Sequence, residues 1–242
     1  LAFDGETLAV DSELAANPFH GVDGTFTRTG TSAHRGSFGY QVDDTDAGVA
    51  NGSSSEAYFW TADLRPSAWL RTWLRANPTS DETGTIYALS AISGRGGSET
   101  PVIELQIRPS ASGLGVAFSG VGSDEPFSSL ASGWHLVELG ATGLGTAAGT
   151  QMLYIDGQAV TLRSANLSSV SIAGFYVGEV YLVSSTFAGT LFFDDVRLTT
   201  YMPASRLRVV APSAFAGDCV SFRVELYTSS GTLSTAPYDV VA

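Results

Sequence analysis

The stretch Ala68–Arg75, AWLRTWLR, alternates between two kinds of side chain. Trp69, Arg71 and Trp73 fall on one side of an extended chain, and leucine and threonine occupy the positions between them. Side chains of a β-strand point alternately to opposite faces, so a period of two predicts a strand with one apolar face and one mixed face. The stretch therefore predicts a strand that covers a hydrophobic core with its leucine side.

The same logic applies along most of the chain, where short apolar runs alternate with Gly, Ser, Asn and Asp turns. This pattern is typical of an all-β sandwich or barrel, and helical periodicity is nearly absent. The predicted strands are Leu1–Phe3, Gly24–Arg28, Ser37–Val42, Ala57–Trp60, Ala68–Arg75, Thr85–Ile92, Val102–Arg108, Gly115–Ser119, Trp134–Gly140, Gln151–Ile155, Gln158–Leu162, Ile172–Val177, Tyr181–Val183 and Thr190–Thr199. Between two of them, Asp156–Gly157 predicts a tight hairpin, because glycine accepts the positive φ that such a turn requires.

A boundary is predicted near Tyr201–Ser205, because Met202–Pro203 interrupts the preceding strand and proline cannot donate to a sheet. Beyond it we expect strands at Arg206–Ala211, Asp218–Thr228 and Ala236–Ala242. We therefore divide the chain into a sandwich at residues 1–201 and a smaller β module at residues 206–242.

Composition narrows the classes of partner. The chain has 242 residues, of which 15% are charged, and its formal net charge is −12 with no lysine among its basic residues. Nucleic-acid binding needs clustered cations, so this charge argues against it, and it argues equally against an anionic membrane surface. No apolar run is long enough to span a membrane, and the single Cys219 is interpreted as a buried side chain without an assigned role.

Three segments resemble the concanavalin A-like, or laminin-G-like, sandwich family of lectins and glucanases. They are GWHLVEL at Gly133–Leu139, LYIDGQAV at Leu153–Val160 and GTLFFDDVRL at Gly189–Leu198. The resemblance implies an antiparallel two-sheet jelly roll over residues 1–201. It also implies that the last of these segments pairs beside the opening strand at Leu1–Leu8.

The remaining segment, residues 206–242, is similar to the first half of a bacterial immunoglobulin-like repeat. It has a strand, an Ala-Gly-x-Cys turn, a long strand and a Ser-Gly turn. It departs from that family by lacking the later strands, so it is predicted to be a partial module. Three strands without closing partners expose an edge that can recruit another chain.

The resemblance also bears on catalysis. Glucanases of this fold carry Glu-x-Asp-x-x-Glu on one strand, whereas the candidate Glu104 is followed by Gln106 and Pro109 at those positions. Related lyases need a Gln-x-His strand and a tyrosine, but here Gln106 is followed by Ile107 and Arg108. We therefore predict no catalytic residue.

Ligand binding has a stronger motif. Sugar rings stack on flat aromatic faces, so Trp69 and Trp73, with Arg71 between them, predict a sugar-binding platform. Trp134 is predicted to pack in the core, and His135 is predicted to be a structural residue of its strand.

Calcium binding is suggested by clustered carboxylates, because the ion takes six to eight oxygen ligands. Alternation predicts that Asp194 and Asp195 point to opposite faces, which leaves one of them near the opening strand. The candidate ligands are Asp4, Asp43, Asp44, Asp46 and Asp195.

These observations favour a secreted, non-catalytic binding or adhesion module of a larger bacterial surface protein, with a glycan or another surface protein as partner. One alternative is a structural subunit of an extracellular fibre or layer that assembles through the incomplete module at residues 206–242. A second alternative is a glycan-active hydrolase or lyase.

Overall fold

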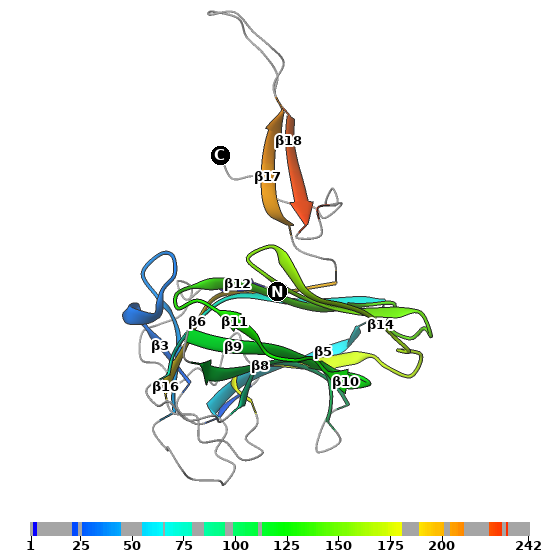
Figure 1. Cartoon of the computed structure of the whole chain (residues 1–242), viewed down its shortest axis with the longest axis horizontal. Helices are drawn as coiled ribbons and strands as arrows, with labels where there is room; N and C mark the ends of the chain where they lie inside the picture. The colour runs from blue at the N-terminus through cyan, green and yellow to red at the C-terminus, as the bar shows by residue number, and fades with distance from the viewer. Residues whose placement is uncertain are drawn as a thin grey trace, which may run out of the picture.

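The structure, a computed structural model, describes residues 2–3, 21–23, 26–44, 55–64, 66–78, 85–94, 99–110, 113–180, 189–200, 204–210, 223–228 and 231. Within these ranges the chain forms antiparallel strands and one short 3-10 turn, η3 (Gly30–Ser32). Figure 1 shows two sheets stacked face to face. The predicted all-β fold with a two-sheet antiparallel sandwich is confirmed.

The first sheet, sheet A, contains eight strands among the described residues. Their order is β14 (Gln158–Ala165), β13 (Gly149–Ile155), β12 (His135–Thr142), β6 (Ser67–Pro78), β16 (Gly189–Thr199), β4 (Gly39–Asp44) and β3 (Thr27–Thr29), with β1 (Ala2–Phe3) paired to β16.

The second sheet, sheet B, also contains eight strands within the described ranges. Their order is β10 (Ser123–Asp124), β9 (Gly113–Gly120), β8 (Thr100–Ser110), β7 (Ile86–Ser93), β15 (Ile172–Glu179), β5 (Ser55–Leu64) and β2 (Gly21–Asp23), with β11 (Ser128–Leu130) paired to β9.

The core lies between the two sheets and takes alternate residues from each strand. On β6 the core-facing residues include Leu70 and Leu74, and on β8 they include Ile103, Leu105 and Ile107. Each such side chain is worth about 1.5–3 kcal/mol when fully buried. The intervening residues of both strands therefore face outward, away from the core.

The two ends of the sandwich meet as the family resemblance implies. Ala2 pairs with Arg197 and Phe3 with Val196, so β1 runs antiparallel beside β16. The rest of the predicted opening strand lies outside the described residues, which resume at residue 21.

The hairpin predicted at Asp156–Gly157 is also present. Asp156 has φ 51° and Gly157 has φ 75°, the pair of positive values that a type I′ turn requires. The carboxylate of Asp156 then accepts the backbone N–H of Leu136 at 2.9 Å, which fastens the turn to β12.

Beyond Thr200 the structure describes a separate two-stranded sheet, β17 (Ala204–Val210) with β18 (Arg223–Thr228). It stands apart from both sheets in Figure 1. The immunoglobulin-like module and the domain boundary remain predictions, because the strand expected at Ala236–Ala242 lies outside the described residues, as do Tyr181–Val183 and Cys219.

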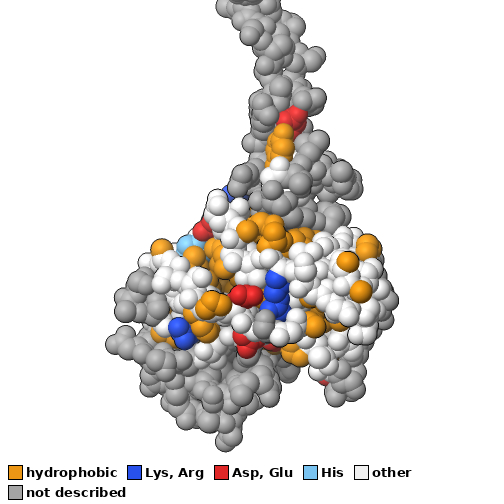
Figure 2. Space-filling model, turned by 45° about the vertical axis from the view of Figure 1, so that its right-hand side comes forward, with side chains coloured by type: hydrophobic (Ala, Val, Ile, Leu, Met, Phe, Trp, Pro, Cys, Tyr) orange, Lys and Arg blue, Asp and Glu red, His pale blue; other side chains and the backbone are white. Residues whose placement is uncertain are grey.

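Among the described residues drawn in Figure 2, few charged side chains reach the surface, and uncharged and hydrophobic groups predominate. This agrees with the low charged fraction of the chain, 15%. No helix in the described part of the chain is long and apolar enough to cross a membrane.

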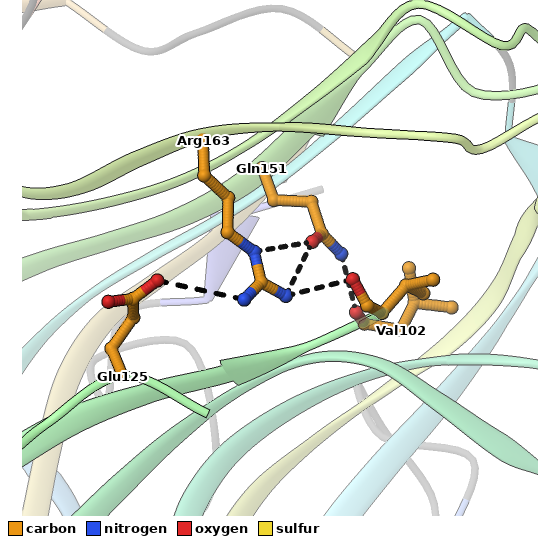
Figure 3. A network of polar contacts seen from close by, with 5 residues as sticks. Val102, Glu125, Gln151 and Arg163 are labelled. Carbon is orange, nitrogen blue, oxygen red and sulfur yellow. Dashed lines mark hydrogen bonds and ion pairs between the residues drawn. The ribbon is translucent and has the colours of Figure 1, made fainter. Parts of the chain in front are cut away.

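One polar network connects the two sheets at one end of the sandwich (Figure 3). Gln151 of β13 is fully buried and donates through Nε2 to the carbonyl of Val102 on β8 at 2.8 Å. The guanidinium of Arg163 donates to Oε1 of Gln151 at 3.0–3.1 Å, and to the carbonyl of Val121 at 2.9 Å. Glu125 lies 3.7 Å from the same guanidinium. Removing the amide would leave a buried carbonyl and part of a guanidinium unsatisfied.

We therefore expect Gln151→Ala to lower the free energy of unfolding by about 2–3 kcal/mol, the cost of leaving buried hydrogen-bonding groups unpaired. Urea denaturation followed by intrinsic fluorescence measures the change. The matched control is Gln158→Ala at an exposed position of β14, which should alter the free energy by less than about 0.5 kcal/mol. Equal effects at the two positions would contradict the structural role of the network.

Candidate functional site

The outer face of sheet B carries a continuous row of polar side chains. Glu104 of β8 is in register with Ser90 of β7 on one side and with Ser119 of β9 on the other. Ser90 is in turn in register with Tyr176 of β15, and Tyr176 with Tyr58 of β5. We call these five residues the Glu104 row.

Glu104 has an unusual environment for a carboxyl group. Its side chain is only 7% exposed, and Oε1 accepts a hydrogen bond from the hydroxyl of Ser90 at 3.2 Å. Burial raises the pKa of Glu104 to about 7, although the hydrogen bonds from Ser90 and Ser119 act in the opposite direction. The group can therefore accept or donate a proton near neutral pH.

Aromatic rings adjoin the other end of the row. The ring centroids of Tyr58 and Tyr176 lie 5.6 Å apart, and Trp60 lies 5.8 Å from Tyr58 and 6.1 Å from Tyr176. All three side chains are half-buried. They place two phenol groups and a flat ring on the same face as Glu104.

Gln106 and Arg108 follow Glu104 on the same strand and alternate with the core residues Ile103, Leu105 and Ile107. Gln106 is 6% exposed, whereas Arg108 is exposed and lies 3.9 Å over the ring of Phe127. The face thus combines an ionisable carboxyl, an amide and a guanidinium on alternate positions. The sequence had singled out this strand, but as evidence against both a glucanase and a lyase of this fold.

The outer face of sheet A carries the predicted sugar platform, and the structure divides its members. Trp69 is 1% exposed and packs against Met152 and Tyr154 of β13. It fits there because its partner on β12 is Gly140, where any Cβ would overlap the indole. The prediction that Trp69 is part of the sugar-binding platform is therefore wrong, since neighbouring strands bury its ring.

Arg71 and Trp73 are both half-buried and line a cavity of about 200 Å³. The other lining residues are Arg35, Asp195 and Arg197. We call this cavity the arginine pocket. Arg71 and Arg197 are directly opposite one another on β6 and β16, a pairing of like charges that costs stability.

The segment after β3 closes one side of this pocket. The backbone N–H groups of His34 and Arg35 donate to Oδ2 of Asp194 at 2.8 and 2.9 Å, which holds the segment on sheet A. The imidazole of His34 then stacks on Trp73 with ring centroids 3.8 Å apart. Burial lowers the pKa of His34, with a further contribution from Arg35, so its ring is mainly uncharged at neutral pH. Asp194 is thus a structural anchor.

A β-bulge decides where the two adjacent aspartates point. The register of β16 shifts between Asp194 and Arg197, and Asp195 has φ 51°, which is uncommon for a residue with a side chain. Asp194 lies on the outer face and Asp195 lines the arginine pocket on that same face. The prediction that they point to opposite faces is wrong, because the bulge breaks the alternation.

The predicted calcium ligands are not brought together among the described residues. Asp43 accepts hydrogen bonds from Gln41 at 2.7 Å and Thr190 at 2.8 Å, whereas Asp195 lines the arginine pocket. No group of three His, Cys, Asp or Glu residues in the described ranges could hold a metal ion. Asp4, Asp46 and the side chain of Asp44 lie outside them, so calcium binding remains a prediction.

Two further predictions concern His135, the first residue of β12, and Trp134, which precedes it. Both ring nitrogens of His135 have partners, with Nδ1 2.7 Å from the Asp156 carboxylate and Nε2 2.9 Å from the carbonyl of Ala131. Trp134 is half-buried and lies outside the core, with its ring 5.0 Å from the guanidinium of Arg75. The prediction that Trp134 packs in the core is wrong.

Glu138 is a buried carboxyl group that sequence reasoning missed. It is fully buried and in register with Arg71, and neither of its carboxylate oxygens has a hydrogen-bond partner in the described part of the chain. Burial raises the pKa of Glu138 to about 7, and the charge of Arg71 lowers it in part. Its position on the outward-facing register of β12 gave no signal that it would be covered.

Comparisons with known proteins now place the fold. No family model and no curated protein match the chain. An endo-β-1,4-glucuronan lyase from the fungus Trichoderma reesei superposes with a TM-score of 0.59 at 14% identity, covering 83% of this chain and 94% of that one. An alginate lyase superposes with a TM-score of 0.60 at 13% identity, covering 82% of this chain and 95% of that one. A cellulose-induced protein superposes with a TM-score of 0.54 at 18% identity, covering 83% and 97%.

At these identities the comparisons establish the jelly-roll sandwich. They also correct the prediction that the chain does not catalyse. The structures that share its architecture include polysaccharide lyases, and the alginate lyase has also been solved with alginate tetrasaccharide and trisaccharide. The prediction rested on two missing motifs, the second carboxylate of a glucanase, replaced by Gln106 and Pro109, and the Gln-x-His strand of a lyase, where Ile107 and Arg108 follow Gln106. The absence of these two motifs is not sufficient to exclude catalysis on this fold.

The raised pKa of Glu138 predicts a pH-dependent stability. The folded state binds a proton more tightly than the unfolded chain, so its advantage falls as pH rises from about 4.5 to about 7. Glu138→Gln removes this loss. We expect the variant to gain stability relative to the parent protein by up to about 3 kcal/mol between pH 4.5 and pH 8. Urea denaturation at both pH values measures the gain. The same difference in free energy of unfolding between variant and parent at pH 4.5 and at pH 8 would contradict the raised pKa of Glu138.

Proposed function

We propose that this chain is a polysaccharide lyase that cleaves an acidic polysaccharide on the outer face of sheet B. The observation that carries the proposal is Glu104, a nearly buried carboxyl with a pKa of about 7 on an outward-facing strand position. The glucuronan and alginate lyases that share the fold support the choice of substrate class, a polymer of uronic acids.

Glu104 is proposed as the general base. A catalytic base works best when its pKa is near the working pH, and the pKa of Glu104, about 7, meets this condition. The hydroxyls of Ser90 and Ser119 hydrogen-bond to the carboxylate and fix its orientation. Their role is to position Glu104.

The proposed reaction is a β-elimination. Glu104 removes the proton on C5 of a uronate, the electron pair forms the C4=C5 double bond, and the C4–O4 bond breaks. Tyr176, two strands away in the same row, donates its phenolic proton to the departing O4. Glu104 and Tyr176 then exchange protons with solvent and return to their starting states. One product fragment has a new non-reducing end with the C4=C5 double bond, and the other ends in a free hydroxyl on the oxygen that was O4.

Charge builds up on the carboxylate of the sugar as the C5 proton leaves. The amide of Gln106 and the guanidinium of Arg108, on the same face of β8, supply N–H donors for that carboxylate. Donors that are already in place lower the barrier more than mobile water does. Elimination requires no second catalytic carboxylate, so Gln106 suits a lyase where it would not suit a retaining glucanase.

The decisive test is cleavage of glucuronan and alginate, with a neutral β-glucan as a control polymer. Product formation is followed by the ultraviolet absorbance of the C4=C5 double bond. We expect cleavage of at least one acidic polymer, with kcat/KM rising with pH and levelling above about pH 7, because Glu104 must lose its proton to act as the base.

We expect Glu104→Gln to lower kcat by at least about 100-fold, the usual contribution of a general base. Tyr176→Phe should lower kcat as well. The matched control is Glu138→Gln, the same change at another buried glutamate with a pKa of about 7 on the opposite sheet. It should leave kcat within about twofold. Full activity in Glu104→Gln, or no cleavage of either acidic polymer, would overturn the proposal.

A further inference from the structure

The arginine pocket lies on the sheet opposite the Glu104 row and takes no part in the proposed reaction. Its five lining residues come from the segment after β3 and from the neighbouring strands β6 and β16. Three of them are arginines, in a chain that has only twelve basic residues and a formal net charge of −12. A quarter of the cations of the chain therefore meet in a single cavity.

The pocket is built at a cost to stability. Arg71 and Arg197 face one another across adjacent strands, and like charges in this position repel. Asp195 is held at φ 51° by the bulge, a conformation that is strained for a residue with a side chain. Strain of this kind clusters at ligand sites, where the surrounding structure enforces it.

The charges around the cavity leave it positive. Asp195 is the single carboxylate among the lining residues that the structure describes. Asp194 is next to it and keeps its negative charge, with the backbone N–H groups of His34, Arg35 and Asp195 donating to its oxygens at 2.8–2.9 Å, so three guanidinium groups stand against two carboxylates. Glu138 faces Arg71 from β12, with its pKa raised to about 7, so it carries only part of a charge near neutral pH.

The shape of the cavity narrows the ligand further. Its volume of about 200 Å³ suits one sugar unit, and Trp73 is among its lining residues. Guanidinium groups bind carboxylates in a planar, two-point arrangement, which suits them better than the single ammonium of lysine. Arg197 is exposed and can reach an incoming group, whereas Arg71 on β6 is half-buried.

We propose that the arginine pocket is a second, non-catalytic site that binds the carboxylate of one uronic acid unit of an acidic glycan. The choice of a uronate rests on the proposed function, because the same polymer would then occupy both faces of the sandwich. Such a site would hold a long chain on the enzyme between cleavage events and would leave the chemistry of each event unchanged.

The experiment is isothermal titration calorimetry with the Glu104→Gln protein, which does not consume the ligand. The probes are a tetrasaccharide of glucuronate or alginate, a tetrasaccharide of uronate-free sugars that carries sulfate esters, and inorganic phosphate. We expect the uronate tetrasaccharide to bind, and Arg71→Ala and Arg197→Ala each to weaken that binding about tenfold or more. The charge-matched control is Arg208→Ala in the separate β17–β18 sheet, which should have no effect on affinity.

Two outcomes would overturn this inference. One is unchanged uronate affinity in both arginine variants, and the other is sulfate or phosphate binding as tightly as the uronate probe. Failure of the proposed function is separate, because it is measured as absent cleavage by the parent protein. In the cleavage reaction, Arg197→Ala should keep the kcat of the parent protein on short substrates and should raise the KM for polymers long enough to reach both faces.

Discussion

The pleat of the β-strand is the constraint on which the other features of this sandwich depend. Because the core takes every second residue of β6 and β8, the remaining residues must face outward, whatever their chemistry. The outward positions hold Glu104, Gln106, Arg71 and Trp73. Packing between the sheets therefore fixes the placement of both candidate sites, and neither site has to contribute to the core.

The two outer faces differ in the surroundings of their buried carboxyl groups. On sheet B, burial shifts the pKa of Glu104 to about 7, and serine hydroxyls on both neighbouring strands satisfy its oxygens. On sheet A, Glu138 has the same raised pKa but no hydrogen-bond partner, and a cluster of arginines follows on the next two strands. A hydrogen-bonded carboxyl suits proton transfer, whereas a concentrated set of guanidiniums suits the binding of an anion.

The corrections share one physical origin, the environment supplied by neighbouring strands. Trp69 looked like half of an open platform, yet Met152 and Tyr154 from β13 cover it. Alternation assigned Asp194 and Asp195 to opposite faces, but a bulge at that point changed the phase of the strand. The prediction of no catalysis used two sequence motifs as its criteria, the carboxylates of a glucanase and the Gln-x-His strand of a lyase, although the fold also occurs in polysaccharide lyases.

The sequence by itself determined an all-β chain, its longer strands and the Asp156–Gly157 hairpin, because local periodicity and turn chemistry depend on adjacent residues. The choice of a two-sheet sandwich over a barrel came from the family resemblance. It also identified Arg71 and Trp73 as one face of a strand. Only the tertiary structure brought Arg35 and Arg197 to that face, set the Glu104 row across five strands and buried Glu104 and Glu138. These features depend on strand order and cross-strand register, which join residues far apart in the chain.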